Sequence, residues 1–313
     1  MTLFQRQLRR AFPGFSSARL CATLAGILIL GPFLFSCLTG AQPSNDQDNK
    51  TKSRNLQWNP PAVDAHLRTL ASSPPCDLSK VLAQAAASES EETTRLQDFT
   101  AEEQIQYQTF DRDGMVQNLG SETFEYNVLF EKSPGGLLFQ EKRNPTHGSN
   151  FTAEASQDMG LPEIVLIFLP NLQDDYEMKC EGQVEWGGQL TWVVHFLQRK
   201  DKPRRTYSFR INNEVHPAAL KGRAWIVAGT GQVVHMETGL MEPVRGVRVQ
   251  QSYLSLDYAP IQFQAEAVRV WLPKLVQGYC DFGDHRTIVA HTFSNFMLFS
   301  VHTDQKIEKP KQN

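Results

Sequence analysis

The stretch EQIQYQTFDRDG, residues 103–114, shows the pattern that most of the chain follows. Apolar side chains alternate with polar ones at Ile105, Tyr107 and, less regularly, Phe110, which is the period of a β-strand with one buried face. Asp111-Arg-Asp-Gly114 then predicts a tight turn, because glycine tolerates the positive φ that such turns need. The stretch therefore predicts one strand of an antiparallel sheet and the turn that reverses the chain.

Similar strand patterns continue to the C-terminal end, separated by short turns that include Gly187-Gly188 and Gly229-Thr-Gly231. Residues 159–170 are apolar and leave strand and short helix open. The predicted strands span residues 123–130, 137–142, 180–186, 189–198, 222–227, 232–237, 247–258, 268–272 and 287–299.

One long helix is predicted before the strands. Asp77 is a suitable N-cap, and apolar residues recur at helical spacing at Leu78, Val81, Leu82 and Ala85. Good helix formers continue the pattern to residue 96. Because long alternating strands bury one face only, we expect an α+β fold: a strongly curved antiparallel sheet, an unclosed β-barrel, with one or two helices packed in its concave face.

The N-terminal residues predict a secretory signal. Four arginines precede an apolar run over residues 20–35, and small residues at Thr39 and Ala41 favour cleavage after Ala41. Two alternatives stay open: acylation of Cys37, since Leu34-Phe-Ser-Cys37 resembles a lipobox, and retention of the apolar run as a membrane anchor. In each case the remainder is expected outside the cytoplasm, in the periplasm or outer envelope.

Composition divides the chain into a signal peptide (1–41), a flexible polar tether (42–61), a single curved-sheet domain (62–302) and a frayed tail (303–313). Cys76, Cys180 and Cys280 remain after cleavage. In an oxidising compartment they allow one disulfide and one thiol, or three thiols, and the sequence does not choose the pair.

Charge and motifs exclude several classes of function. A formal net charge of −3 provides no basic field for nucleic acid. The chain has neither a phosphate-binding loop nor a Gly-x-Ser-x-Gly elbow, and its eight histidines are spread out. We therefore predict no metal, no cofactor and no catalytic residue. An envelope hydrolase remains as an alternative, which would draw on the carboxylates Asp174, Asp175, Glu181 and Glu185.

A further indication comes from the strings Gly222-Arg-Ala-Trp-Ile226, Val233-Val-His-Met-Glu237 and Val270-Trp-Leu-Pro273, after a signal and a helix. This arrangement, over about residues 76–300, resembles the periplasmic lipoprotein-carrier superfamily, with its Lol carrier and receptor and its sigma-factor regulators. It is also similar to uncharacterised secreted bacterial proteins. The resemblance implies an unclosed barrel with helices as a lid and an apolar cavity for acyl chains. It carries over no residue roles.

The resulting hypothesis is a non-enzymatic envelope protein that binds an acyl lipid or a lipoprotein in a half-barrel cavity. Membrane association is expected only through an acylated Cys37 or a retained signal. The alternative is a structural or partner-binding envelope module with a filled core. The candidate cavity residues are Trp192, Val194, Phe196, Trp225 and Trp271.

Overall fold

The computed structural model describes residues 58–95, 98–133, 136–146, 158–159, 163–211, 214–263 and 269–298. They lie in one compact unit, Lys50–Asn313. The predicted signal peptide with Cys37, most of the predicted tether and the predicted tail lie outside the described residues.

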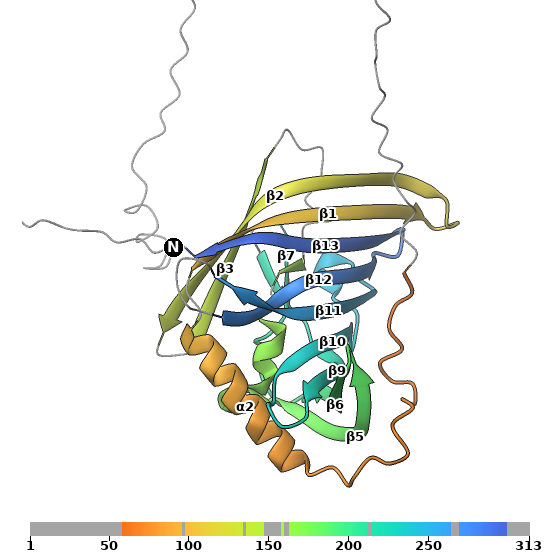
Figure 1. Cartoon of the computed structure of the whole chain (residues 1–313). Helices are drawn as coiled ribbons and strands as arrows, with labels where there is room; N and C mark the ends of the chain where they lie inside the picture. The colour runs from red at the N-terminus through yellow and green to blue at the C-terminus, as the bar shows by residue number, and fades with distance from the viewer. Residues whose placement is uncertain are drawn as a thin grey trace, which may run out of the picture. The chain divides into compact units, whose positions relative to one another are not determined.

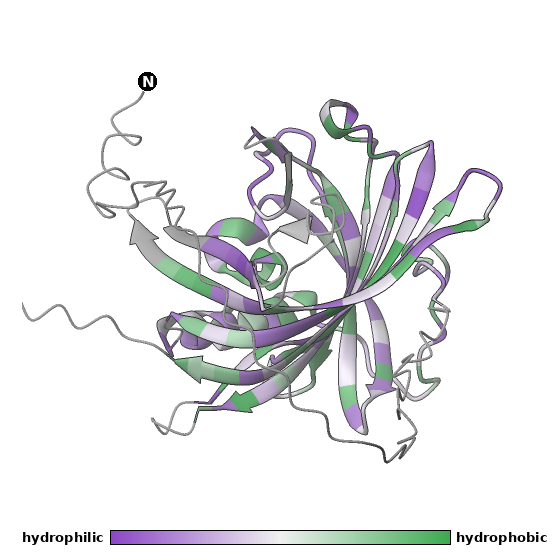
Figure 2. Ribbon diagram, turned by 90° about the horizontal axis from the view of Figure 1, so that it is seen from above, coloured by the Kyte–Doolittle hydropathy of each residue, from purple (hydrophilic) through white to green (hydrophobic). Residues whose placement is uncertain are grey.

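Ten strands form one antiparallel sheet, and β3 and β5 stand at its two edges, so the sheet remains open (Figure 1). Seen from above, the strands curve around the short helical segments (Figure 2). The structure confirms the predicted α+β class and the curved, unclosed sheet. In spatial order the strands are β3 (Gly136–Pro145), β2 (Val116–Ser133), β1 (Phe99–Asp111), β13 (His285–Leu298), β12 (Arg269–Asp281), β11 (Gln251–Gln262), β10 (Val233–Leu240), β9 (Leu220–Val227), β6 (Gln189–Gln198) and β5 (Tyr176–Trp186).

The pairing of β1 with β13 brings distant parts of the chain together. The register runs from Asp111 opposite His285 to Phe99 opposite Leu298, so the last described strand lies beside the first. The predicted turn at Asp111 forms as expected: the Met115 N–H donates to Asp111 Oδ1 at 2.8 Å, and Gly114 has φ +83°. A second sheet, of three short strands, contains β4 (Asp158–Met159), β7 (Ser208–Ile211) and β8 (Glu214–Pro217).

The predicted helix is α2 (Leu78–Arg95), and Asp77 caps it by accepting the Lys80 N–H at 3.1 Å. One turn of the sheet allows the helix to approach closely. Gly231, between β9 and β10, has φ +78°, and a Cβ atom there would lie 2.3 Å from the Gln84 carbonyl. Only glycine fits that position, so Gly231 allows α2 to lie this close to the turn.

The apolar residues before β5 form the 3₁₀ helix η1 (Ile164–Phe168) and the short helix α3 (Pro170–Gln173). Ile164, Ile167 and Phe168 are fully buried in the main core cluster, together with residues from many strands of the sheet. For residues 164–170 the open choice between strand and helix is thus resolved as helix, whereas Met159 lies in strand β4 and residues 160–162 lie outside the described residues. The side chains of η1 fill part of the concave space. A final 3₁₀ turn, η2 (Arg245–Val247), precedes β11.

Strand β12 continues well beyond the predicted 268–272, through Pro273 to Asp281. Proline cannot donate a ladder hydrogen bond, which is why it interrupts strand patterns. The register between β11 and β12 shifts at this point, because Asp257 pairs with Leu275 and Tyr258 with Pro273. Lys274 is therefore the extra residue of a β-bulge, which accommodates the proline within the sheet.

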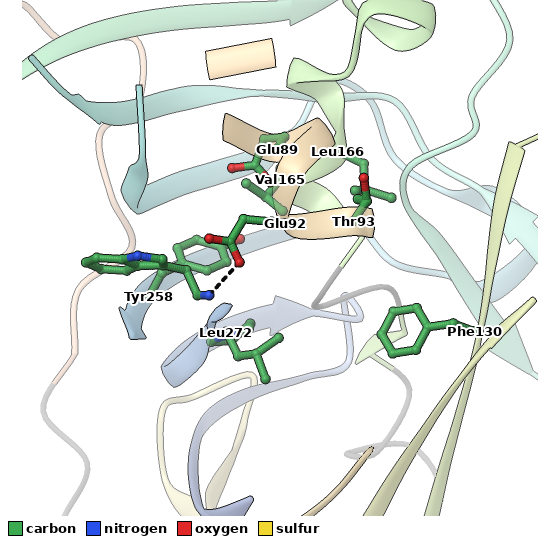
Figure 3. A pocket seen from close by; sticks show the side chains of 10 residues that line it. Glu89, Glu92, Thr93, Phe130, Val165, Leu166, Tyr258 and Leu272 are labelled. Carbon is green, nitrogen blue, oxygen red and sulfur yellow. Dashed lines mark hydrogen bonds between the residues drawn. The ribbon is translucent and has the colours of Figure 1, made fainter. Parts of the chain in front are cut away.

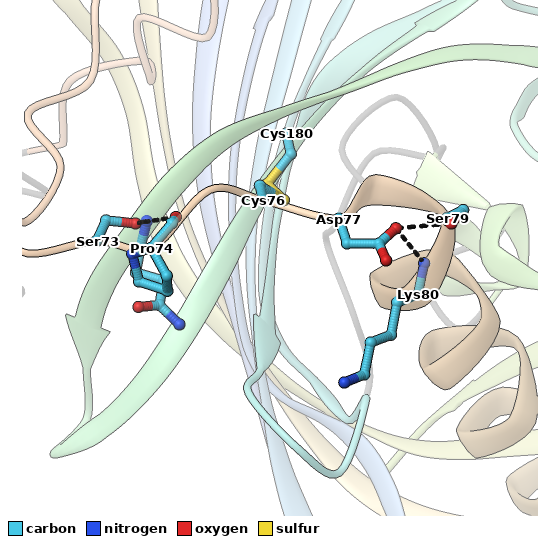
Figure 4. Close-up of a disulfide and its surroundings, with 8 residues drawn as sticks. Ser73, Pro74, Cys76, Asp77, Ser79, Lys80 and Cys180 are labelled. Carbon is cyan, nitrogen blue, oxygen red and sulfur yellow. Dashed lines mark hydrogen bonds between the residues drawn. A yellow bond between two sulfur atoms is a disulfide. The ribbon is translucent and has the colours of Figure 1, made fainter.

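Residues 58–75 cross the outer face of the sheet and are held there by polar contacts. The Leu70 N–H donates to the Gln183 carbonyl at 2.8 Å. Arg223 donates to Glu181, with Nε to Oε2 at 2.5 Å, and to the carbonyls of Ala62 and Ala65. This segment then leads into the disulfide Cys76–Cys180, one residue before the cap of α2 (Figure 4). Cys280 is not part of a disulfide.

Loss of the disulfide is expected to lower the free energy of unfolding by about 2–5 kcal/mol, because the bond restricts the unfolded chain across a separation of 104 residues. Urea titrations of oxidised wild type and Cys76→Ser measure this difference. Cys280→Ser is the control: it keeps the bond and should remain sensitive to reductant, whereas Cys76→Ser should not. Equal midpoints for Cys76→Ser and oxidised wild type would contradict a stabilising disulfide.

Candidate functional site

Three of the five predicted cavity residues share the concave face of β6. Val194 and Phe196 are fully buried in the main core cluster, and Trp192 is partly buried against it. Phe196 lies opposite Gly222 of β9, where a Cβ atom would be 2.6 Å from the phenyl ring. The glycine that opens the Gly222-Arg-Ala-Trp-Ile226 string therefore makes room for this ring.

Trp225 lies on the other face of the sheet. It pairs in register with Val193, and both belong to a separate small cluster with Val234. Its ring packs edge-to-face on His235, with 4.6 Å between ring centroids, and Trp186 stacks on the same imidazole at 4.0 Å. Trp225 therefore does not share a concave wall with Val194 and Phe196. Whether it takes part in binding stays a prediction.

Trp271, the fifth predicted residue, lines a small cavity of about 20 Å³ between α2, η1 and the sheet, which has room for about one water molecule. The carboxyl groups of Glu89 and Glu92 extend from α2 toward the cavity, with Leu272 below them in this view (Figure 3). The lining residues are Glu89, Glu92 and Thr93 of α2, Val165 and Leu166 of η1, and Phe130, Tyr258, Trp271, Leu272 and Pro273 of the sheet.

Glu89 is the most unusual group in this cavity. Only 4% of the residue is exposed, and its Oε1 has no hydrogen-bond partner within the described residues. Burial, with a smaller effect from Glu92, raises the pKa of Glu89 to about 8, so the carboxyl is protonated at neutral pH. A buried polar atom without a partner destabilises the folded state, since water would have satisfied it.

Glu92 is the second carboxyl of the cavity, and it does have a partner. Its Oε2 accepts the backbone N–H of Trp271 at 3.0 Å, which connects α2 to β12. Burial raises the pKa of Glu92, while this hydrogen bond and the charge of Arg95 oppose the change. The two carboxyls thus differ: Glu92 holds the helix to the sheet, whereas Glu89 Oε1 has no donor within the described part of the chain.

The helix places Glu89 inward through simple spacing. Val81, Ala85 and Glu89 are four residues apart and are the buried residues of α2. We did not single out Glu89 from the sequence, where it is one of several acidic residues at the end of the helix. Extending the apolar spacing by one more step would have identified it.

Glu103 of β1 is also a buried carboxylate, but in contrast to Glu89 it has hydrogen-bond partners. It accepts hydrogen bonds from Arg143 Nε at 2.6 Å and from His291 Nδ1 at 2.8 Å. Burial opposes ionisation, but Arg143 and His291 outweigh it and hold the pKa of Glu103 at about 2. This is a satisfied ionic group within the core, unlike Glu89.

Glu163, at the N-terminal end of η1, resembles Glu89. Burial, with a smaller effect from Glu141, raises the pKa of Glu163 to about 8. Two carboxyls near the concave face are therefore neutral at pH 7: Glu89 on α2 and Glu163 directly before η1.

The four carboxylates considered for hydrolysis do not form a site. Asp175 pairs with Arg205, with Oδ2 to Nη2 at 2.7 Å, and Glu181 pairs with Arg223, while Asp174 and Glu185 are exposed. Within the described ranges, no cluster of three His, Cys, Asp or Glu side chains could hold a metal ion. In the same part of the chain, no helix is sufficiently long and apolar to cross a membrane.

No family model and no curated protein matches this chain. The solved structures that it resembles include a DUF1329 family protein from Desulfovibrio piger (11% identity, 75% of this chain and 98% of that one, TM-score 0.38). Another is an outer membrane lipoprotein-sorting protein domain from Vibrio parahaemolyticus (12%, 73% and 96%, TM-score 0.36). A third is a LolA superfamily protein from Nitrosomonas europaea (8%, 72% and 96%, TM-score 0.29).

Two of these three names belong to the lipoprotein-carrier group that the sequence resembles. The highest of the three TM-scores is 0.38. The function is therefore inferred from the chain's own residues.

The raised pKa of Glu89 predicts a pH-dependent stability. The folded state keeps the proton up to pH about 8, whereas the unfolded chain loses it near 4.5. Unfolding therefore releases a proton between these values, and stability falls as pH rises, by up to about 1.4 kcal/mol per pH unit. Urea titrations at several pH values between about 5 and about 8 measure the slope.

Glu89→Gln should reduce this slope by about one proton. Glu163 contributes with the same sign, so some slope will remain. Glu91→Gln is the matched control, because Glu91 lies on the same helix with 61% of its side chain exposed, next to Arg95. Parallel curves for wild type and Glu89→Gln would show that Glu89 titrates normally.

Proposed function

We propose that this protein is a non-enzymatic binding protein of the cell envelope that takes an acyl chain, of a lipid or a lipoprotein, between α2 and the concave face of its sheet. The observation that carries the proposal is Glu89: the buried face of α2 presents to an apolar core a carboxyl whose Oε1 has no hydrogen-bond partner among the described residues. A helix that only had to close a core would gain stability from an apolar side chain at this position.

Both α2 and η1 cover the concave face of the sheet, and α2 is the less strongly held of the two. Its buried residues are Val81, Ala85 and Glu89, with Leu78 and Leu82 only partly buried against the core, whereas η1 fully buries Ile164, Ile167 and Phe168. Small and polar side chains bury little apolar area, so α2 separates from the core at a lower cost than η1. Displacing α2 exposes apolar residues such as Leu272 and Tyr258.

An acyl chain could replace the contacts of α2. Burying a long chain contributes on the order of 10 kcal/mol before binding costs, at about 0.8 kcal/mol per methylene group. The cavity of about 20 Å³ is far too small for such a chain. Binding therefore requires α2 to move away from the sheet.

The envelope location rests on the predicted signal peptide. The disulfide Cys76–Cys180 supports it, because disulfides persist in oxidising compartments and are rare in the cytosol.

The small cavity also favours a second candidate, a partner-binding module with a filled core. In that case the side chains of η1 and α2 remain in place, and binding uses the outer surface. The two candidates differ in one respect: only the acyl-chain carrier has to open.

Native mass spectrometry of the mature protein purified from its own envelope, followed by organic extraction, gives the first test. We expect an extractable acyl lipid bound to the protein. An apo mass alone, under gentle conditions and at native expression, would favour the partner-binding module.

Locking α2 in place tests the opening directly. Ser88 Oγ lies 3.2 Å from Gln232 Oε1, so Ser88→Cys with Gln232→Cys, in a Cys280→Ser background, allows a short bismaleimide to join helix and sheet. The cross-linked protein should lose binding of a dodecanoyl monoglyceride by at least about tenfold. Each single cysteine variant, treated with a monofunctional maleimide, is the control and should bind normally. Full binding by the cross-linked protein would contradict a moving α2.

A further inference from the structure

The cavity under α2 combines acidic and aromatic groups in a way that an acyl chain alone does not need. Glu89 and Glu92 form one side, and the rings of Tyr258, Trp271 and Phe130 lie among the other lining residues. Aromatic faces attract cations through their negative π-surfaces, and carboxylates supply the opposite charge. Apolar side chains alone would be sufficient for a hydrocarbon.

Glu89 Oε1 could accept a hydrogen bond from a donor outside the described residues, such as a ligand. Its Oε1 is buried without a partner, and the groups that act on its pKa are Glu92 and burial itself, with no cation among the described residues. Tyr258 is the other titratable group in contact with this cavity, and Arg95, Glu91 and Arg269 act on Glu92 rather than on Glu89. A group that donates hydrogen bonds and carries positive charge would satisfy Glu89.

The size of the space fits such a group. About 20 Å³ accommodates one water-sized group, and an ammonium group is of similar size. Val165, Leu166 and Leu272 continue the lining with apolar surface, along which an alkyl chain could extend once α2 moves.

We propose that this cavity binds the protonated amino group of an amine-bearing lipid, with Glu89 as its counter-charge and Tyr258 and Trp271 as aromatic walls. This inference rests on the proposed function and names the class of headgroup. Glu92 remains hydrogen-bonded to the Trp271 N–H and keeps α2 in register.

Binding is then coupled to a proton. At pH 7 the Glu89 carboxyl is protonated, since burial raises its pKa to about 8. An incoming ammonium group stabilises the carboxylate, so the carboxyl proton leaves to the buffer and an ion pair forms. A neutral chain in the same place releases no proton, which separates the two kinds of ligand.

The test compares four probes by isothermal titration calorimetry in buffers of different ionisation enthalpy: dodecylamine, dodecanol, dodecanoate and butylamine. We expect dodecylamine to bind at least about tenfold more tightly than dodecanol, and to release about one proton at pH about 7. Dodecanoate should bind most weakly. Butylamine distinguishes a free amine from a lipid headgroup, because it carries the charge without the chain and should bind much more weakly than dodecylamine.

Glu89→Gln keeps the shape of the side chain and removes its ability to ionise. It should keep the affinity for dodecanol and lose both the preference for dodecylamine and the proton release. Glu91→Gln, on the exposed side of the same helix, should behave as wild type. Circular dichroism checks that both variants are folded, and proton release by wild type tests the proposal without any variant.

The outcomes separate the two proposals. Equal binding of dodecylamine and dodecanol without proton release overturns the amine site and leaves the acyl-chain function standing. Binding of butylamine as tight as that of dodecylamine overturns the lipid chain as part of the ligand and keeps the amine site. No binding of any probe to wild type overturns both.

Discussion

The structure depends on covering the apolar concave face of a single open sheet. The strands of this sheet direct every second side chain toward its concave face. Phe99, Phe196 and Leu254 are examples, and they pack in one common core. Apolar side chains are stable only out of contact with water, so the concave face requires a cover from elsewhere in the chain. η1 provides apolar side chains for it, whereas α2 provides a narrow face that ends in Glu89. Glu89 is therefore both the polar end of this buried helix face and a lining residue of the candidate site.

The period of the sequence was sufficient to predict the sheet. Alternation at Ile105 and Tyr107, with a turn at Asp111, gave the strand and its hairpin because side chains in a strand alternate between faces. The same alternation does not say which face meets the core. Val194 and Trp225 are both apolar, yet one lies on the concave side and the other on the outer side. Only the register of β6 with β9 distinguishes them.

Other features could not be predicted from the local sequence pattern, each for its own physical reason. The second half of β12 could not be predicted because Pro273 interrupts the strand pattern. A strand accommodates this proline only through the bulge opposite β11, which the sequence does not show. The pairing of Cys76 with Cys180 depends on the tertiary fold, which brings together two cysteines that are 104 residues apart in the sequence. Glu89 could have been found by helical spacing, but its lack of a partner is visible only with the sheet in place. The signal peptide and Cys37 remain predictions.

The two ends of α2 are both attached to the sheet. At its start the disulfide joins Cys76 to β5, an edge strand. At its end the chain leads to Asp98, which accepts the Phe130 N–H of β2 at 2.8 Å, and then into β1. A helix of 18 residues is about 27 Å long, so this covalent span limits how far β5 and β1 can separate. If α2 moves as proposed, this span sets an upper limit on the bulk of a molecule that could enter beneath the helix, as long as the disulfide is intact.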